Sequence, residues 1–192
     1  MWQSKLEHHD PMFPYFKDHL AYSFTSDVPT ECACCGQVKI CHSLSGEFGD
    51  TGKSDLCFDC LKDGAAMPVD CWLNEAMPDE SVIEKYGQEK ADEISNLITY
   101  CTPSLPTWQD MQWPRIDGDF GVFIKLASQH DFNGPVDLHS CIPEDELYGH
   151  SPDEIWERIS DKPITSLKDG NYDCSFYLFE SNGRRVVTWD LS

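Results

Sequence analysis

The sequence predicts an α+β protein, a small mixed fold with a four-cysteine zinc-knuckle module and a C-terminal β-hairpin. Two Cys-x-x-Cys pairs lie within residues 32–60, a stretch of helical periodicity fills residues 79–101, and two strand-like segments meet at a turn within residues 174–191. Because helices and strands do not alternate regularly along the chain, a doubly wound parallel sheet is not expected. We expect one domain over residues 1–192, with the metal-knuckle module at about residues 30–66.

The cysteine pairs, Cys32 with Cys35 and Cys57 with Cys60, have the spacing of a tetrahedral metal site. A gap of two residues lets one backbone turn, or knuckle, direct both sulfurs toward a point about 2.3 Å away, and two such turns complete a shell of four thiolates. Gly36 follows the first pair, where a left-handed residue turns N–H groups toward sulfur. We predict structural zinc held by these four cysteines, and iron is the alternative metal.

The segment between the pairs contains three further potential ligands: Cys41, His42 and Asp50. A short strand could bring Cys41 or His42 to the metal in place of Cys57 or Cys60, so this alternative stays open. Cys34 lies between ligand cysteines and is expected to point away from the metal. Four cysteines packed as small apolar residues are the alternative without a metal. A second metal site is a further hypothesis, from three residues whose spacing matches no tight knuckle: His130, His139 and Cys141.

The cysteines are interpreted as metal ligands because we expect a cytoplasmic protein. Residues 1–14 are polar and interrupted by proline, so they provide neither the apolar core of a signal peptide nor a membrane span. In the cytoplasm thiols stay reduced, which favours metal binding over disulfides. Thioredoxin-like chemistry is not expected, because neither pair is predicted to lie between a hydrophobic strand and the start of a helix.

The composition is strongly acidic, with 34 Asp and Glu against 14 Lys and Arg and a formal net charge of −20. Such a field repels phosphate, so nucleic-acid binding through a basic surface is not expected. A basic protein partner fits this charge, and a merely solvated acidic surface is the simpler alternative. No membrane association is expected, and the sequence does not indicate an oligomeric state.

The first half of the chain contains an arm, a short strand and the helical stretch. Residues 12–24 are aromatic and irregular, which is typical of an extended arm, and residues 37–44 could form a short strand. The helical stretch is expected to have a capping box at Ser81–Glu84 and to divide at Gly87. It should end before Pro103, because the proline ring disfavours helix at the preceding residue.

The second half of the chain is expected to supply most of the β structure. Residues 119–126 are rich in β-branched and aromatic side chains and predict a strand. Ser151–Pro152 is a helix start, with a side-chain cap followed by proline at the first helical position. The segments 174–180 and 184–191 predict strands joined at Asn182–Gly183, which favours a tight primed turn.

An enzyme is the competing functional hypothesis. Its site, distinct from the zinc, would lie near two tryptophans and three aspartates: Trp108, Trp113, Asp110, Asp117 and Asp119. Tryptophan more often packs in a core than lines a cleft, and aspartates beside a glycine more often form a turn than an acid–base pair. Four protein ligands also leave zinc no open position for hydrolysis. An interaction module is therefore favoured.

The order of these motifs resembles the bacterial CbrC family. The resemblance covers about residues 12–126 and 173–190 and rests on five segments: Glu31–Gly36, Leu56–Ala66, Thr102–Pro103, Trp108–Trp113 and Tyr177–Asp190. It implies a small cytosolic protein of undefined molecular activity, with a role in stress or, as the family name suggests, colicin tolerance. It also implies that the four paired cysteines bind the metal.

The chain departs from the family pattern at two places. Members of the family usually carry further cysteines after the position of Trp113 and within the last hairpin, where this chain has Arg115–Gly118 and Ser181–Gly183. Any second metal site of the family is therefore expected to be absent here. Residues 127–172 also form a longer insert than the resemblance predicts, and the sequence does not indicate its role.

Overall fold

The fold is α+β, as predicted. The computed structural model describes residues 12–44, 55–64, 72–107, 111–170 and 173–191. Within these ranges the helices are α1 (His19–Tyr22), α2 (Phe58–Lys62), α3 (Glu80–Tyr86), α4 (Gln88–Cys101), α5 (Pro135–Cys141) and α6 (Pro152–Trp156). The strands are β1 (Thr30–Glu31), β2 (Val38–Lys39), β3 (Cys41–Ser43), β4 (Asp55–Cys57), β5 (Arg115–Ile116), β6 (Asp119–Phe120), β7 (Val122–Leu126), β8 (Cys174–Ser181) and β9 (Arg184–Leu191).

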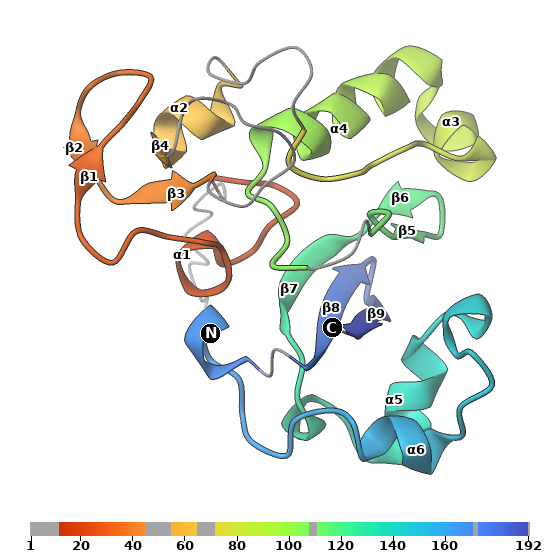
Figure 1. Cartoon of the computed structure of the whole chain (residues 1–192). Coiled ribbons are helices and arrows are strands. Elements are labelled where there is room, and N and C mark those ends of the chain that lie inside the picture. Colours follow the sequence, from red (N-terminus) through yellow and green to blue (C-terminus); the bar gives the residue numbers. More distant parts are fainter. Residues whose placement is uncertain (1–11, 45–54, 65–71, 108–110, 171–172, 192) are drawn as a thin grey trace, which may run out of the picture.

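The largest sheet in the described part of the chain is antiparallel, with the order β7-β8-β9 (Figure 1). β8 and β9 pair along their full length of eight residues each. Asn182 and Gly183 connect them with φ of 51° and 79°, the left-handed conformation that a primed hairpin turn requires. The predicted C-terminal hairpin is therefore confirmed, and β7 adds a third strand beside it.

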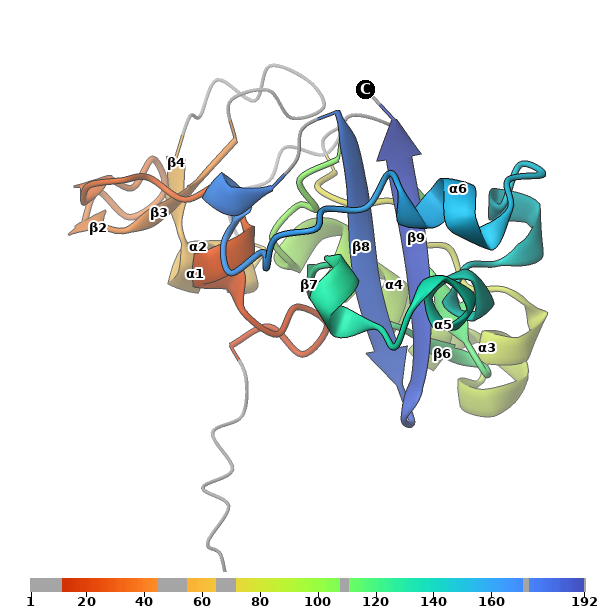
Figure 2. The ribbon, with the colours of Figure 1, turned by 90° about the horizontal axis from the view of Figure 1, so that it is seen from below.

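Side chains of β8 alternate between two hydrophobic cores, as expected for a strand buried on both faces. Phe176 and Leu178 pack in one core with the buried side chains of α5 and α6, whereas Tyr177 and Phe179 pack in the other. Figure 2 shows the sheet upright, with α5 and α6 on one side and the β1–β4 region on the other. The sheet thus lies between α5–α6 and the cysteine module, whereas Ile164 and Leu167, farther along the chain, pack in the core that contains the module.

The cysteine module shares its core with the rest of the protein. Phe58 of α2 packs edge-on against Phe13 of the N-terminal arm, with ring centroids 5.9 Å apart. Phe16 of the same arm contacts Phe123 of β7 at 4.7 Å. The arm is irregular apart from the single turn of α1, as predicted for residues 12–24, and it connects the module to the sheet.

The helical stretch divides at Gly87, as predicted, because this residue has φ of 78° and ends α3 before α4 begins. The predicted cap at Ser81 is wrong. The carboxylate of Asp79 accepts the Val82 N–H at 3.0 Å, so α3 begins two residues earlier. At α6, Ser151 provides the expected side-chain cap, and the Glu154 carboxylate completes a capping box. None of the described helices is long and apolar enough to cross a bilayer.

Candidate metal centre

The first knuckle lies between the paired strands β1 and β2. The Cys32 N–H donates to the Gln37 carbonyl at 2.9 Å, and the Gly36 N–H donates to the Cys32 carbonyl at 2.8 Å. Gly36 has φ of 69°, which a residue with a side chain rarely adopts. The left-handed turn predicted at Gly36 is therefore present, and it directs the thiols of this segment toward α2.

The second knuckle lies at the junction of β4 and α2. Cys57 is the last residue of β4 and the N-cap of α2, and Cys60 lies in the first turn of that helix. The expectation that neither pair lies between a strand and a helix is wrong for this pair. β4 has three residues, which is too short for an alternating pattern to reveal it.

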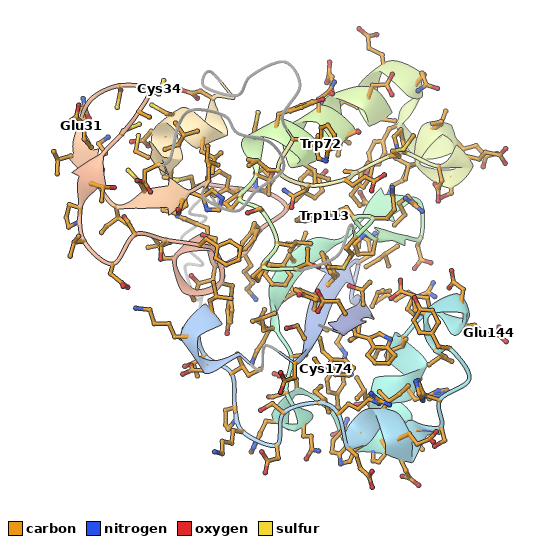
Figure 3. The ribbon with its side chains drawn as sticks, viewed as in Figure 1. Glu31, Cys34, Trp72, Trp113, Glu144 and Cys174 are labelled. Carbon is orange, nitrogen blue, oxygen red and sulfur yellow. The ribbon has the colours of Figure 1, made fainter. Side chains whose placement is uncertain are left out.

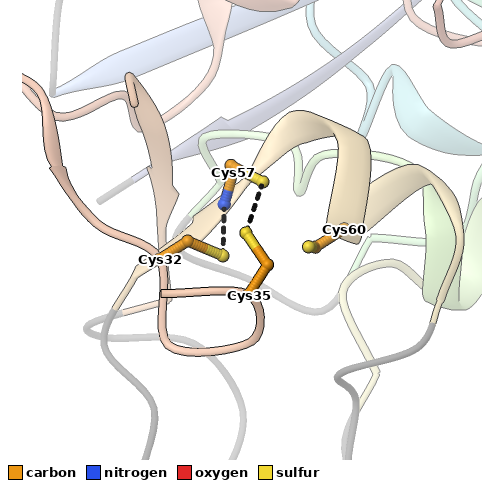
Figure 4. Close-up of side chains that lie close together, drawn as sticks. All are labelled: Cys32, Cys35, Cys57 and Cys60. Atoms are coloured by element: carbon orange, nitrogen blue, oxygen red, sulfur yellow. Dashed lines mark hydrogen bonds between the residues drawn. The ribbon is translucent and has the colours of Figure 1, made fainter. Parts of the chain in front are cut away.

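The four predicted cysteines come together (Figure 4). The Sγ atoms of Cys32, Cys35, Cys57 and Cys60 all lie within 4.8 Å of one another. The Cys35 and Cys57 sulfurs are 3.8 Å apart. This agrees with the edge of a tetrahedron built on metal–sulfur bonds of about 2.3 Å, which is about 3.8 Å. The donor set therefore fits a single metal ion with four thiolate ligands.

This group is the only one in the described ranges with three or more potential ligands in such proximity. The structure does not gather His130, His139 and Cys141 into a second site. His130 instead lies with its Nε2 atom 3.0 Å from the Asp161 carbonyl oxygen. Asp50 lies outside the described residues.

Backbone N–H groups stabilise the thiolate form of Cys32. Burial raises the pKa of this thiol, but N–H donors from Cys35, Cys57 and Cys34 outweigh burial and lower the pKa to about 6. The Cys57 N–H lies 3.2 Å from the Cys32 sulfur. Burial raises the pKa of Cys57 and Cys60, and a bound cation would favour the thiolate form of both.

The site lies at the edge of the core. Cys32 and Cys57 are buried, Cys60 is half-buried and Cys35 is exposed. An exposed ion pair between Lys39 of β2 and Asp59 of α2, with a Nζ–Oδ2 distance of 2.7 Å, joins the two knuckles. A metal could therefore enter from solvent and be held against the core on its other side.

The alternative ligands have other contacts. Cys41 faces Cys57 across the β3–β4 ladder, but its thiol donates to the carbonyls of Thr30 and Lys39, and burial raises its pKa. His42 is buried, with its Nε2 atom 3.2 Å from the hydroxyl oxygen of Ser104. Neither side chain belongs to the four-sulfur group.

Cys34 is exposed and does not belong to the four-sulfur group (Figure 3). Burial is the main cause of the raised pKa of Cys60, and the nearby thiols, that of Cys34 among them, raise it further. Cys34 thus lies outside the four-sulfur group, although its thiol is close to that of Cys60. The Cys-x-x-Cys spacing does not predict that the Cys34 thiol lies near Cys60.

The tryptophan considered for a catalytic cleft is a core residue. Trp113 is fully buried, and its indole N–H donates to the Gly121 carbonyl at 2.7 Å (Figure 3). Its ring packs edge-on against Phe179 with centroids 5.4 Å apart. These contacts fix the bend between β6 and β7. Trp108 lies outside the described residues.

The aspartates of the enzyme hypothesis lie at the turn between β5 and β6. Asp117 has φ of 52° and forms an ion pair with Arg184. Asp119 forms an ion pair with Lys85 of α3, with an O–N distance of 2.9 Å. Each carboxylate thus has a separate cationic partner, an arrangement that secures the turn. Asp110 lies outside the described residues.

Comparison with known proteins identifies the family of this chain. No curated protein and no solved structure matches the sequence. The model of an uncharacterised protein family, UPF0167, matches residues 11–183. This match covers most of the chain, includes both knuckles and the strands β7 and β8, and ends just before β9. The chain therefore belongs to the uncharacterised protein family UPF0167.

Proposed function

We propose that this protein is a zinc-stabilised protein-interaction module. In this proposal Cys32, Cys35, Cys57 and Cys60 hold one structural zinc ion, and the acidic surface binds a basic protein. The observation that supports the metal is the convergence of the four sulfurs to within 4.8 Å of one another. The bound ion supplies folding energy, because four thiolates fill a tetrahedral shell and leave no position for water.

The metal would join two knuckles that few other contacts connect. The Ala33 N–H donates to the Asp55 carbonyl at 2.9 Å, and the Lys39–Asp59 ion pair is exposed to solvent. Structural zinc contributes about 10–16 kcal/mol of apparent binding free energy, whereas an exposed ion pair contributes at most about 1 kcal/mol. The ion would therefore contribute more free energy to holding the two knuckles together than these polar contacts do.

The basic partner is inferred from charge. A net charge of −20 on 192 residues attracts cationic proteins over a distance comparable to the Debye length, which accelerates encounter. This attraction should weaken strongly with added salt. We also propose that the family corresponds to the CbrC proteins of the bacterial cytoplasm, which the motif order resembles and whose name links it to stress or colicin tolerance.

Two measurements test this proposal. Metal analysis of the freshly purified protein should give one zinc ion per chain. A panel of basic proteins, titrated at low and at high salt, should include a partner whose affinity falls as salt increases. Absence of metal contradicts the structural role, and binding that is absent or insensitive to salt contradicts the acidic interaction surface.

A further inference from the structure

A second feature lies at the edge of the sheet formed by β9, where buried residues of both cores line a cleft. A cleft of about 490 Å³ is bordered by the β5–β6 hairpin, the start of β9 and the segment that follows α5. Figure 1 shows β5–β6 and α5 on either side of β9. Such a volume suits a small organic molecule.

The cleft concentrates the arginines of the protein. The chain has four arginines, and three of them, Arg115, Arg184 and Arg185, line this cleft. The fourth, Arg158, follows α6 and does not line it. Arg184 and Arg185 are adjacent at the start of β9, and Arg115 of β5 joins them at the cleft. Arginine also matches planar oxyanions better than lysine does, because it presents several N–H donors in a fixed fork.

Arg185 is held in place from several directions. Its Nη1 donates to the Asp131 carbonyl at 2.8 Å, and its Nη2 lies 3.1 Å from a carboxylate oxygen of Asp137. Its guanidinium carbon lies 5.2 Å from the centre of the Phe132 ring. These contacts orient the guanidinium group before any ligand arrives, which reduces the entropy lost on binding.

The other two arginines are oriented in a similar way. Arg115 pairs through Nε with Asp79 at 3.3 Å, and Arg184 pairs through Nη1 with Asp117. A guanidinium group has five N–H donors. Arg115 also donates from Nη1 to the Met77 carbonyl at 3.2 Å and to the Gln112 side-chain oxygen at 3.4 Å, so its described contacts engage two nitrogens, whereas those of Arg184 engage one. The acidic partners thus position the arginines and leave further donor capacity on each for a ligand.

Three acidic residues also line the cleft: Asp79, which pairs with Arg115, and Asp145 and Glu146 in the segment after α5. Burial, with a smaller contribution from the charge of Asp145, raises the pKa of Glu146 to about 7. Near neutral pH this carboxyl group is therefore protonated in a large share of molecules and can donate a hydrogen bond. The cleft thus offers cationic donors together with a mixed donor–acceptor group.

We propose that this cleft binds a small organic oxyanion, a carboxylate or a phosphate ester, whose oxygens accept hydrogen bonds from Arg115, Arg184 and Arg185. A neutral polar part of the ligand faces Glu146. This site is independent of the metal centre and of the proposed basic partner, because the residues that form it come from β5, β9 and the segment after α5.

Calorimetric titration of the full chain with citrate, glucose 6-phosphate and inorganic phosphate tests this proposal, with sodium chloride at matched ionic strength as the blank. Arg184→Gln should weaken binding of the preferred probe by about 10-fold to 100-fold, because one charge-assisted hydrogen-bonding group is lost. Arg184→Lys should restore only part of the affinity, because lysine keeps the charge without the fork. Arg158→Gln is the matched control and should bind like the unmodified protein.

The results separate the possible ligands. Preference for citrate assigns a carboxylate, and preference for glucose 6-phosphate over inorganic phosphate assigns a phosphate ester. Equal weakening by Arg158→Gln would show general charge attraction, and absence of heat with every probe at millimolar concentration would show that no oxyanion site exists. Either result overturns the proposal. The Arg184 side chain is exposed, so its replacement should not disturb the core. The circular dichroism spectrum of each variant checks that the protein is folded.

Discussion

Replacing Cys57 with alanine probes the metal centre, and Cys41 supplies a matched control. The two residues face each other in the β3–β4 ladder, and they are equally buried, at 1 % and 0 % exposure. The Cys57 sulfur belongs to the four-sulfur group, whereas the Cys41 thiol donates to backbone carbonyls. The two substitutions therefore delete the same atom from the same environment and differ in their effect on the metal.

The expected difference follows from these positions. Each substitution removes one buried sulfur and leaves a small cavity, which costs about 1–2 kcal/mol of folding free energy. Cys57→Ala also removes one of four ligands from a site whose apparent binding free energy is about 10–16 kcal/mol. An even share for one ligand is about 2.5–4 kcal/mol, so the total loss is about 3.5–6 kcal/mol. Because the free energy of unfolding of an ordinary domain is about 5–15 kcal/mol, Cys57→Ala should remove a large part of the stability.

The assay combines metal content with urea unfolding of both variants. Cys41→Ala should retain its metal and unfold slightly earlier than the unmodified protein, and Cys57→Ala should lose its metal and unfold far earlier. If Cys41→Ala loses the metal and Cys57→Ala keeps it, the ligand set is wrong. If both variants lose the same stability with no change in metal content, the four sulfurs act as apolar packing groups.

Three further substitutions test other parts of the structure. Asp79→Ala should lower the free energy of unfolding by about 1 kcal/mol through loss of the α3 cap, and Ser81→Ala should lower it less; the opposite order in urea melts would place the cap at Ser81. Trp113→Phe should cost about 2–4 kcal/mol, because it removes a buried hydrogen bond and ring volume, and an unchanged melting temperature would contradict its core role. The raised pKa of Glu146 means that the folded state binds its proton more tightly than the unfolded state, so its contribution to stability is present below about pH 4.5 and is lost as the pH rises to about 7. A shift of this size corresponds to at most about 3 kcal/mol, which partial exposure reduces to about 1–2 kcal/mol. Glu146→Gln should remove this part of the pH dependence of unfolding. Identical pH profiles for the variant and the unmodified protein would refute the raised pKa of Glu146.

Local patterns predicted the parts of the fold that depend on neighbouring residues. The Asn182–Gly183 turn, the break at Gly87 and the left-handed position at Gly36 each follow from the conformational preference of one or two residues. Each Cys-x-x-Cys knuckle was predictable for the same reason, since it is a local turn. Only the meeting of the two knuckles depends on the rest of the chain.

Features that require distant segments were not predictable from these patterns. β7 pairs with β8 across more than fifty residues of sequence, and alternation within β7 does not indicate its partner. The arginine cleft depends on this pairing, because it brings Arg115 near Arg184 and Arg185. The cap at Asp79 was missed for a different reason, since both Asp79 and Ser81 are good capping residues and the choice depends on where the helix packs.

Metal stoichiometry of the freshly purified protein, measured by atomic spectroscopy under reducing conditions, tests the central claim most directly. We expect one zinc ion per chain, lost together with folded structure in the module when a strong chelator is added. One iron ion with a red colour would keep the ligands and change the metal. Protein that stays free of metal when zinc is supplied, or that binds two ions per chain, would contradict the account.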